Sequence, residues 1–237
     1  MTEIHKLASF VDSLHYREKT GPQLDPKKGC FPFITISRQA GAGGQGLATL
    51  LAEEIQKLHH EPLFQGWQLC NQELCQMIAQ DPALKSSVES LRHTEYHSHA
   101  EDMLAQLIYG GLSQDLVVKK MFHVMRVFAL HGKVIFVGRG STFLTHDLPL
   151  GIHVRLEAPL EVRVQRMMEG LHVDAKKARN VIEEKDKAKA TLVKTYFHKD
   201  IRDPLNYDAV WNTARVTVEE IARILIDMVR ARAARAS

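Results

Sequence analysis

Cysteines are scarce in this chain, and long apolar runs are absent. Only three of its 237 residues are cysteine, an odd number that suits a reducing compartment better than a disulfide framework. Cys70 and Cys75 are too far apart for a C-x-x-C pair, so we do not expect zinc. No apolar stretch is long enough to span a bilayer, and the N-terminus contains acids and no apolar h-region, so it does not resemble a signal peptide. We therefore expect a cytoplasmic protein without membrane contact.

Excess charge of one sign is also missing. The formal net charge is +3, which is too small to indicate a nucleic-acid partner. Apolar residues make up 45% of the chain and charged residues 25%, as in an ordinary globular protein. His93 and His97 have the spacing of a helical metal chelate, but their neighbours do not complete a metal motif. A solvated helix face is the favoured interpretation, and we expect no metal site.

Residues 33–51 form the stretch around which the rest is organised. The apolar run from Phe33 to Ile36 predicts a buried strand, and apolar residues from Leu47 onward recur at helical spacing. Between them lies a glycine cluster made of Gly41, Gly43, Gly44 and Gly46. This layout is typical of a phosphate-binding loop, because glycines let the backbone approach a ligand and the helix start presents N–H groups to an anion. The alternative is a tight turn that only packs the helix on the sheet.

Strand and helix patterns alternate along the remaining chain. Further strands are predicted at 64–69, 133–137, 152–156 and 207–211. Helices are predicted at 71–79, 84–91, 96–109, 116–130, 160–168 and 174–198, and a capping box at 217–220 opens a last one. This order predicts an α/β fold with a parallel, doubly wound sheet of about five strands.

The chain divides into an N-terminal extension and one main domain. Residues 1–30 read as an amphipathic helix and a linker, and residues 31–237 as the domain itself. The extension either docks on the domain or binds a partner, with docking favoured. The mostly helical part at 71–130 has no strand signal and reads as an insert on one edge of the sheet.

Two predicted strands end in residues suited to phosphate. Arg38 and the glycine cluster follow the first strand, and Gly138-Arg139-Gly140 follows the strand at 133–137. Ligands of such sheets bind outside the carboxyl ends of the strands, where these two segments would meet. Arginine grips phosphate with two parallel hydrogen bonds, so the convergence favours a phosphate site.

Five ordered segments resemble the cytidylate kinase-like family, a branch of the P-loop nucleoside monophosphate kinases. They are ITISRQAGAGG, VIFVGRG, HVRLEAPLEVRVQRM, EEKDKAKATLVKTYF and YDAVWNT, spread over about residues 33–230. The resemblance implies a P-loop NTPase-like three-layer fold with a helical monophosphate-binding insert at 71–130 and a helical lid at 160–200. It also implies phosphoryl transfer from ATP, with Mg²⁺, to CMP or dCMP.

The glycine cluster departs from the usual kinase loop, G-x-x-G-x-G-K-G-T. A gapless superposition places the first glycine on Arg38, the lysine on Gly44 and the threonine on Gly46. The lysine that cradles the transferred phosphate and the hydroxyl that holds Mg²⁺ are therefore both missing. Two alternatives stay open, a non-catalytic nucleotide- or phosphate-binding protein on a kinase scaffold and a kinase for another small molecule.

The resemblance implies roles for individual residues. Donor phosphates would lie against the backbone of the loop formed by Gly41, Ala42, Gly43, Gly44, Gln45 and Gly46. Arg38 would supply the charge of the missing lysine, unless it forms a surface salt bridge. Arg139 would hold the acceptor monophosphate, and Lys189 would contact phosphate from the lid, unless its helix is simply exposed. Arg163 and Arg166 share a helix face and would contact the donor nucleotide, unless that face is solvated.

Overall fold

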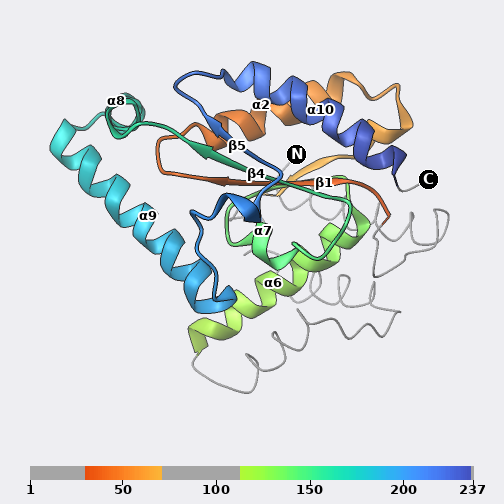
Figure 1. The fold of residues 1–237 in the computed structure, drawn as a ribbon, viewed down its shortest axis with the longest axis horizontal. Coiled ribbons are helices and arrows are strands. Elements are labelled where there is room, and N and C mark those ends of the chain that lie inside the picture. The colour runs from red at the N-terminus through yellow and green to blue at the C-terminus, as the bar shows by residue number, and fades with distance from the viewer. Residues whose placement is uncertain (1–29, 71–112, 236–237) are drawn as a thin grey trace, which may run out of the picture.

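The computed structural model describes residues 30–70 and 113–235 of the chain (Figure 1). The predicted N-terminal helix and the predicted helices between residues 71 and 112, with His93 and His97, lie outside these ranges. None of the helices in the described ranges is both long and apolar enough to cross a membrane.

A five-stranded sheet in the order β2-β3-β1-β4-β5 forms the centre of the domain. The strands are β1 (Phe33–Arg38), β2 (Gln68–Cys70), β3 (Val134–Val137), β4 (Gly151–Glu157) and β5 (Ala209–Asn212). All neighbouring strands run parallel, and Ile34 of β1 lies opposite Ile135 of β3 and Ile152 of β4. This arrangement confirms the predicted α/β fold with its parallel sheet.

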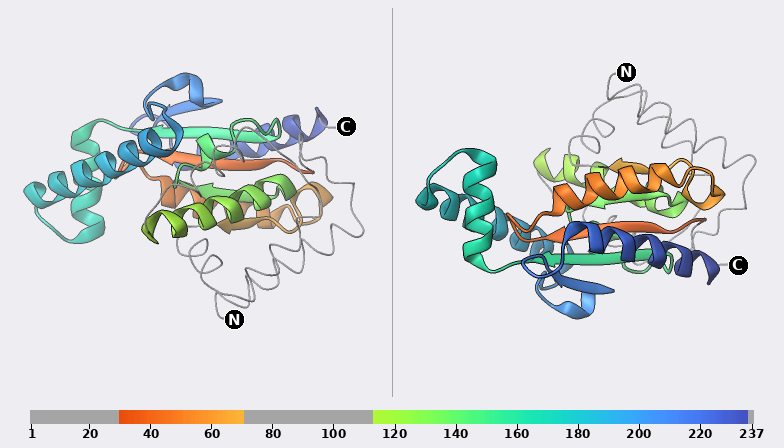
Figure 2. Two further views of the ribbon diagram at one scale, coloured as in Figure 1. Left: turned by 90° about the horizontal axis from the view of Figure 1, so that it is seen from below. Right: turned by 90° about the horizontal axis from the view of Figure 1, so that it is seen from above.

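Helices cover both faces of the sheet (Figures 1 and 2). On one face α2 (Gly44–Lys57) packs beside α10 (Val218–Ala234), and on the other lie α6 (Ser113–His131) and the short α7 (Ser141–Leu144). α8 (Leu160–Leu171) and α9 (Ala175–Phe197) pack together beyond the carboxyl ends of the strands, where a lid was expected. Single 3-10 turns lie at Pro62–Phe64 and Pro204–Asn206.

The two faces of the central strands differ in character. Ile152, Val154 and Leu156 of β4 belong to the apolar cluster under α2 and α10. The residues that alternate with them are His153 and Arg155, both buried, and Glu157. Because successive side chains of a strand point to opposite faces, the face toward α7 is polar at its centre. This polar face positions the groups described below.

Some element boundaries differ from those predicted. The strand expected at 64–69 begins only at Gln68, because Pro62 opens a 3-10 turn and Gly66 has a φ of 71°. α7 has no counterpart in the prediction. α6, whose sequence was assigned to the insert, packs on the sheet face through Phe122, Met125 and Phe128. The capping box is present, since Thr217 and Glu220 each accept a hydrogen bond from the other's backbone N–H.

Candidate functional site

The glycine loop joins β1 to α2 at the carboxyl edge of the sheet. Gly41 and Gly43 have φ angles of 78° and 86°, in the left-handed region that other residues rarely adopt. Gly43 is the N-cap of α2, and no side chain caps the helix start or places an acid in its first turn. The N–H groups of this helix end and its partial positive charge are thus not neutralised locally.

Arg38 connects the glycine loop to the turn after β3. Its aliphatic stem lies against Gly44, where an added Cβ would come within 2.7 Å of the Arg38 Cγ. Its guanidinium lies over Gly138, in the space that a side chain there would need. Among the described residues no carboxylate forms an ion pair with Arg38, so it is not part of a surface salt bridge there.

Arg139 occupies a turn with unusual backbone. Gly138, Arg139 and Gly140 have φ angles of 74°, 58° and 70°, three left-handed residues in succession. For Arg139 this conformation costs about 1 kcal/mol, a cost that is typical of functional positions. A Cβ on Gly140 would lie 2.5 Å from Cε2 of Phe197, so the absence of a side chain there lets α9 approach.

A cavity of about 320 Å³ lies between this turn, Arg38 and α9. Its charged lining consists of Arg38, Arg139, Lys185 and Lys189, and no carboxylate of the described residues joins them. Ser37, Ser141 and Thr142 add hydroxyl groups, and Phe143, Leu192 and Ile201 add apolar surface. Such a mixture of cations, hydroxyls and apolar walls suits an anion with an apolar or aromatic part.

The cations perturb one another. Burial and the neighbouring Arg139 lower the pKa of Arg38, and Asp186 opposes them. Burial also lowers the pKa of Lys189, and Arg38 and Lys185 add to the effect against the attraction of Asp186. Positive charges held this close are stabilised by a bound anion, because each disfavours the charged form of the others.

Asp186 joins α9 to the glycine loop. Its Oδ1 accepts a hydrogen bond of 2.7 Å from the backbone N–H of Ala40 and one of 3.0 Å from Lys189. Its Oδ2 is 2.7 Å from Nη1 of Arg163. The carboxylate therefore fixes the position of the loop and of Lys189 together.

Arg163 and Arg166 both support the glycine loop from α8. Arg163 is buried and donates to the carbonyls of Ala158 and Ala40 as well as to Asp186. Arg166 donates to Oγ1 and the carbonyl of Thr213, whose hydroxyl in turn donates to the Ala42 carbonyl. Neither arginine lines the cavity. Their assignment as donor-nucleotide contacts stays a prediction.

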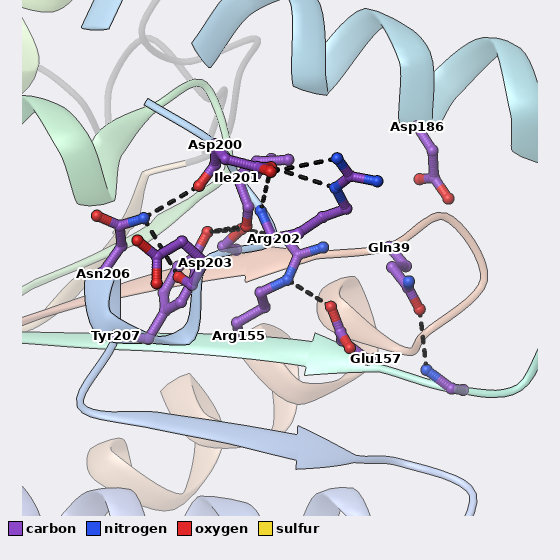
Figure 3. Close-up of polar contacts among 12 residues, drawn as sticks. Gln39, Arg155, Glu157, Asp186, Asp200, Ile201, Arg202, Asp203, Asn206 and Tyr207 are labelled. Atoms are coloured by element: carbon purple, nitrogen blue, oxygen red, sulfur yellow. Dashed lines mark hydrogen bonds and ion pairs between the residues drawn. The ribbon is translucent and has the colours of Figure 1, made fainter. Parts of the chain in front are cut away.

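Polar contacts at the end of β4 hold the segment that follows α9 (Figure 3). Arg155 donates to Glu157 at 2.7 Å. It also donates to the Ser37 hydroxyl at 3.1 Å. Tyr207 donates to the carbonyl of Ile201, and burial raises the pKa of its phenol, so it stays protonated. These bonds hold Ile201 and Ser37 in the cavity wall.

An exposed ion pair and a turn lie in the segment between α9 and β5. Arg202 pairs with Asp200, while Asp203 accepts a hydrogen bond from the backbone of Leu205 and opens the turn there (Figure 3).

Three residues predicted from the sequence, Arg38, Arg139 and Lys189, thus converge on one cavity. Residues 41–46 do not line it, and the Arg38 stem lies against Gly44. The contact of residues 41–46 with donor phosphates stays a prediction. The role of Asp186 was not predicted from the sequence. Its bond to Ala40 spans 146 residues in sequence, and no local pattern could have indicated it.

Known proteins resemble this chain in sequence. The sequence profile of the Cytidylate kinase-like family matches residues 33–215. A cytidylate kinase of Methanopyrus kandleri is 34% identical over 109 residues, which cover 42% of this chain and 56% of that protein. The chain thus spans little more than half the length of this curated relative.

A solved structure is similar in fold. The crystal structure of an uncharacterized protein from Eubacterium ventriosum ATCC 27560 has a TM-score of 0.66 and 21% identity, and it covers 84% of this chain and 98% of its own. At this identity the likeness concerns the fold alone.

Proposed function

This chain belongs to the cytidylate kinase-like family, and on that premise we propose that it is an ATP-dependent nucleoside monophosphate kinase acting on CMP or dCMP. The observation that carries the proposal is the cavity whose lining brings Arg38, Arg139, Lys185 and Lys189 together. The similarity to a cytidylate kinase supports the choice of acceptor.

Three of the four cations have distinct tasks in this proposal. Arg139, at the end of β3, binds the acceptor monophosphate, since arginine matches the geometry of phosphate oxygens. Arg38 neutralises the phosphoryl group in transfer, in place of the lysine that would extend from position 44. Lys189 adds positive charge from α9. Such positioning and charge neutralisation are the main requirements of phosphoryl transfer.

The acceptor phosphate is itself the nucleophile and already carries negative charge. No general base is needed, and none is assigned. The side chains instead orient the two nucleotides, by holding donor and acceptor oxygens close together in the cavity. Asp186 keeps the glycine loop and Lys189 in place for this task through its bonds to Ala40 and Lys189.

The described residues do not offer a ready Mg²⁺ site. Asp186 is committed to Arg163, Lys189 and a backbone N–H, and Glu157 is paired with Arg155. No group of three potential ligands gathers anywhere in the described ranges. Mg²⁺ often binds mainly through nucleotide phosphates, so in this family it would arrive with the donor, and we assign no step to it.

A non-catalytic nucleotide-binding protein is the second candidate. The specific observation that favours it is the pair Gly44 and Gly46, which stand where the kinase loop carries lysine and a hydroxyl. Both candidates predict nucleotide binding, and only the first predicts turnover.

The deciding experiment measures ADP formation from ATP and Mg²⁺ with a panel of nucleoside monophosphates. We expect ADP with CMP or dCMP, and a loss of at least about 100-fold in Arg139→Ala, as for removal of a preorganised contact to the reacting group. Arg223→Ala, an exposed arginine on α10, serves as the matched control and should keep full activity. Nucleotide binding without turnover for any acceptor would favour the second candidate, and equal rates in Arg139→Ala would reject the role of Arg139.

A further inference from the structure

A line of hydrogen bonds runs from the cavity into the sheet. Thr142, which lines the cavity from α7, has its Oγ1 2.9 Å from Oγ1 of Thr35. The same Thr35 oxygen is 2.8 Å from Nδ1 of His153. Thr35 and His153 are direct neighbours in the β1–β4 register, and all three side chains are buried.

The histidine end of this line is isolated. Nε2 of His153 is buried, and no hydrogen-bond partner for it exists in the described part of the chain. A Cβ on Gly151 would lie only 2.6 Å from this nitrogen, so the ring is closely covered. Burial lowers the pKa of His153 to about 4, against the attraction of Asp208, so the ring is neutral near pH 7 and carries one proton.

The position of that proton follows from the partners. A proton on Nε2 would bury an N–H group without an acceptor, which costs more than a buried lone pair without a donor. A proton on Nδ1 is donated to Thr35. The neutral ring of His153 therefore favours the Nδ1–H tautomer.

The tautomer sets the direction of the whole line, because each hydroxyl has a single proton. Thr35 accepts from His153 and so gives its own proton to Thr142. Thr142 therefore accepts from Thr35 and keeps its own hydroxyl proton available. No acceptor for this proton lies among the described residues. In the Nε2–H tautomer Thr142 would donate to Thr35, and its hydroxyl could then only accept hydrogen bonds from a ligand in the cavity.

We propose that this directed line makes Thr142 a hydrogen-bond donor to a phosphate oxygen of the bound nucleotide. Thr142 is then a ligand-binding residue, and Thr35 and His153 are positioning residues that act through it. The inference rests on the proposed function in that the ligand of the cavity is a nucleoside monophosphate. The four cations in the same cavity wall favour an anionic acceptor for this proton over a neutral one.

Binding of CMP and of cytidine, which lacks the phosphate, tests the donor role by calorimetry. Thr142→Val keeps the shape and removes the hydroxyl, and we expect it to weaken CMP binding about tenfold while cytidine binding stays unchanged. Thr142→Ser restores the hydroxyl and should restore CMP affinity. If the wild-type protein binds CMP no better than cytidine, the proposed function fails and this inference with it. If wild type binds CMP and Thr142→Val binds it equally well, only this inference is overturned.

The tautomer is tested independently by ¹⁵N NMR of the imidazole nitrogens, with the His153 signals assigned by their loss in His153→Asn. We expect the proton on Nδ1 near pH 7, and a proton on Nε2 would overturn the inference without any use of ligand. Thr35→Val breaks the line without altering the cavity wall, and it should weaken CMP binding several-fold while Thr35→Ser does not. Equal CMP affinity in Thr35→Val and Thr35→Ser would also overturn the positioning role.

Discussion

The carboxylate of Asp186 accepts a hydrogen bond from the backbone N–H of Ala40 at 2.7 Å, which ties α9 directly to the glycine loop. The same carboxylate pairs with Arg163, a buried arginine on α8. One side chain thus connects the loop with both helices beyond the sheet edge. The loop conformation depends on this carboxylate as well as on its glycines.

Substitution of Asp186 should separate its two contributions. Asp186→Asn keeps an acceptor for the Ala40 N–H but loses the ion pairs with Arg163 and Lys189, whereas Asp186→Ala loses the acceptor and both ion pairs. We expect Asp186→Ala to lower the unfolding free energy by about 1–3 kcal/mol and Asp186→Asn by less. Urea denaturation measures both values. Equal losses in the two variants would show that the bond to Ala40 contributes nothing.

Moving the positive charge from position 38 to position 44 tests whether Arg38 replaces the missing lysine. Arg38→Ala should weaken ATP binding and slow turnover by about tenfold or more, because a cation next to phosphate is lost. The double variant Arg38→Ala/Gly44→Lys should recover part of both, since removal of the Arg38 stem opens the space above Gly44. Gly44→Lys alone should not bind ATP better than wild type. Unchanged binding and turnover in Arg38→Ala would reject the substitution hypothesis.

His153 should make the fold sensitive to mild acid. Its pKa is about 4 in the folded protein, against about 6.5 in the unfolded chain, so protonation favours unfolding. The stabilising contribution is complete above pH 6.5 and declines as the pH falls toward 4, by on the order of 3 kcal/mol in total. Facing groups are Asp208 and Asp147, which oppose the shift, and His146 and Arg232, which add to it.

Denaturation at pH 7 and at pH 4.5 measures this effect. The wild-type protein should lose more stability between the two values than His153→Asn does, because an asparagine side chain does not titrate. The difference between the two proteins isolates His153 from nearby carboxylates such as Asp147. Identical losses in the two proteins would contradict the low pKa.

Gly140 should tolerate no side chain. Gly140→Ala combines a left-handed backbone with overlap against Phe197, and we expect a loss of about 1–3 kcal/mol in unfolding free energy. Gly170→Ala is the matched control, since an added Cβ in α8 meets nothing within 4 Å and should stabilise by up to about 1 kcal/mol. Thermal and urea unfolding compare the two, and equal stability would reject the packing argument.

The sheet could be predicted from sequence because its strands carry local signals. The apolar run at 133–137 and the β-branched run after Phe33 indicate buried strands whatever their neighbours are. The alternation of Ile152, Val154 and Leu156 with polar residues also contained the signal of a polar sheet face. What that face contacts depends on α7, a helix of four residues that is too short to give a periodic pattern.

The candidate site was predictable where it depends on strand ends. Arg38 ends β1 and Arg139 lies just after β3, and the carboxyl ends of adjacent parallel strands lie side by side. Lys189 was selected only through the family resemblance. The direction of the Arg163 side chain, which passes beneath the glycine loop, follows from the packing of α8 and could not be read from its spacing to Arg166.

The conformation of the turn that carries Arg139 is fixed by residues outside the turn. With two glycines, Gly138-Arg139-Gly140 is conformationally very free in the unfolded chain. Its own sequence therefore does little to favour the left-handed backbone observed in the folded protein. The selection comes from Phe197 on one side and the Arg38 guanidinium on the other, both of which fill the space where side chains would be. The orientation of Arg139 toward the cavity therefore depends on tertiary packing, and an isolated peptide with this sequence would not retain it.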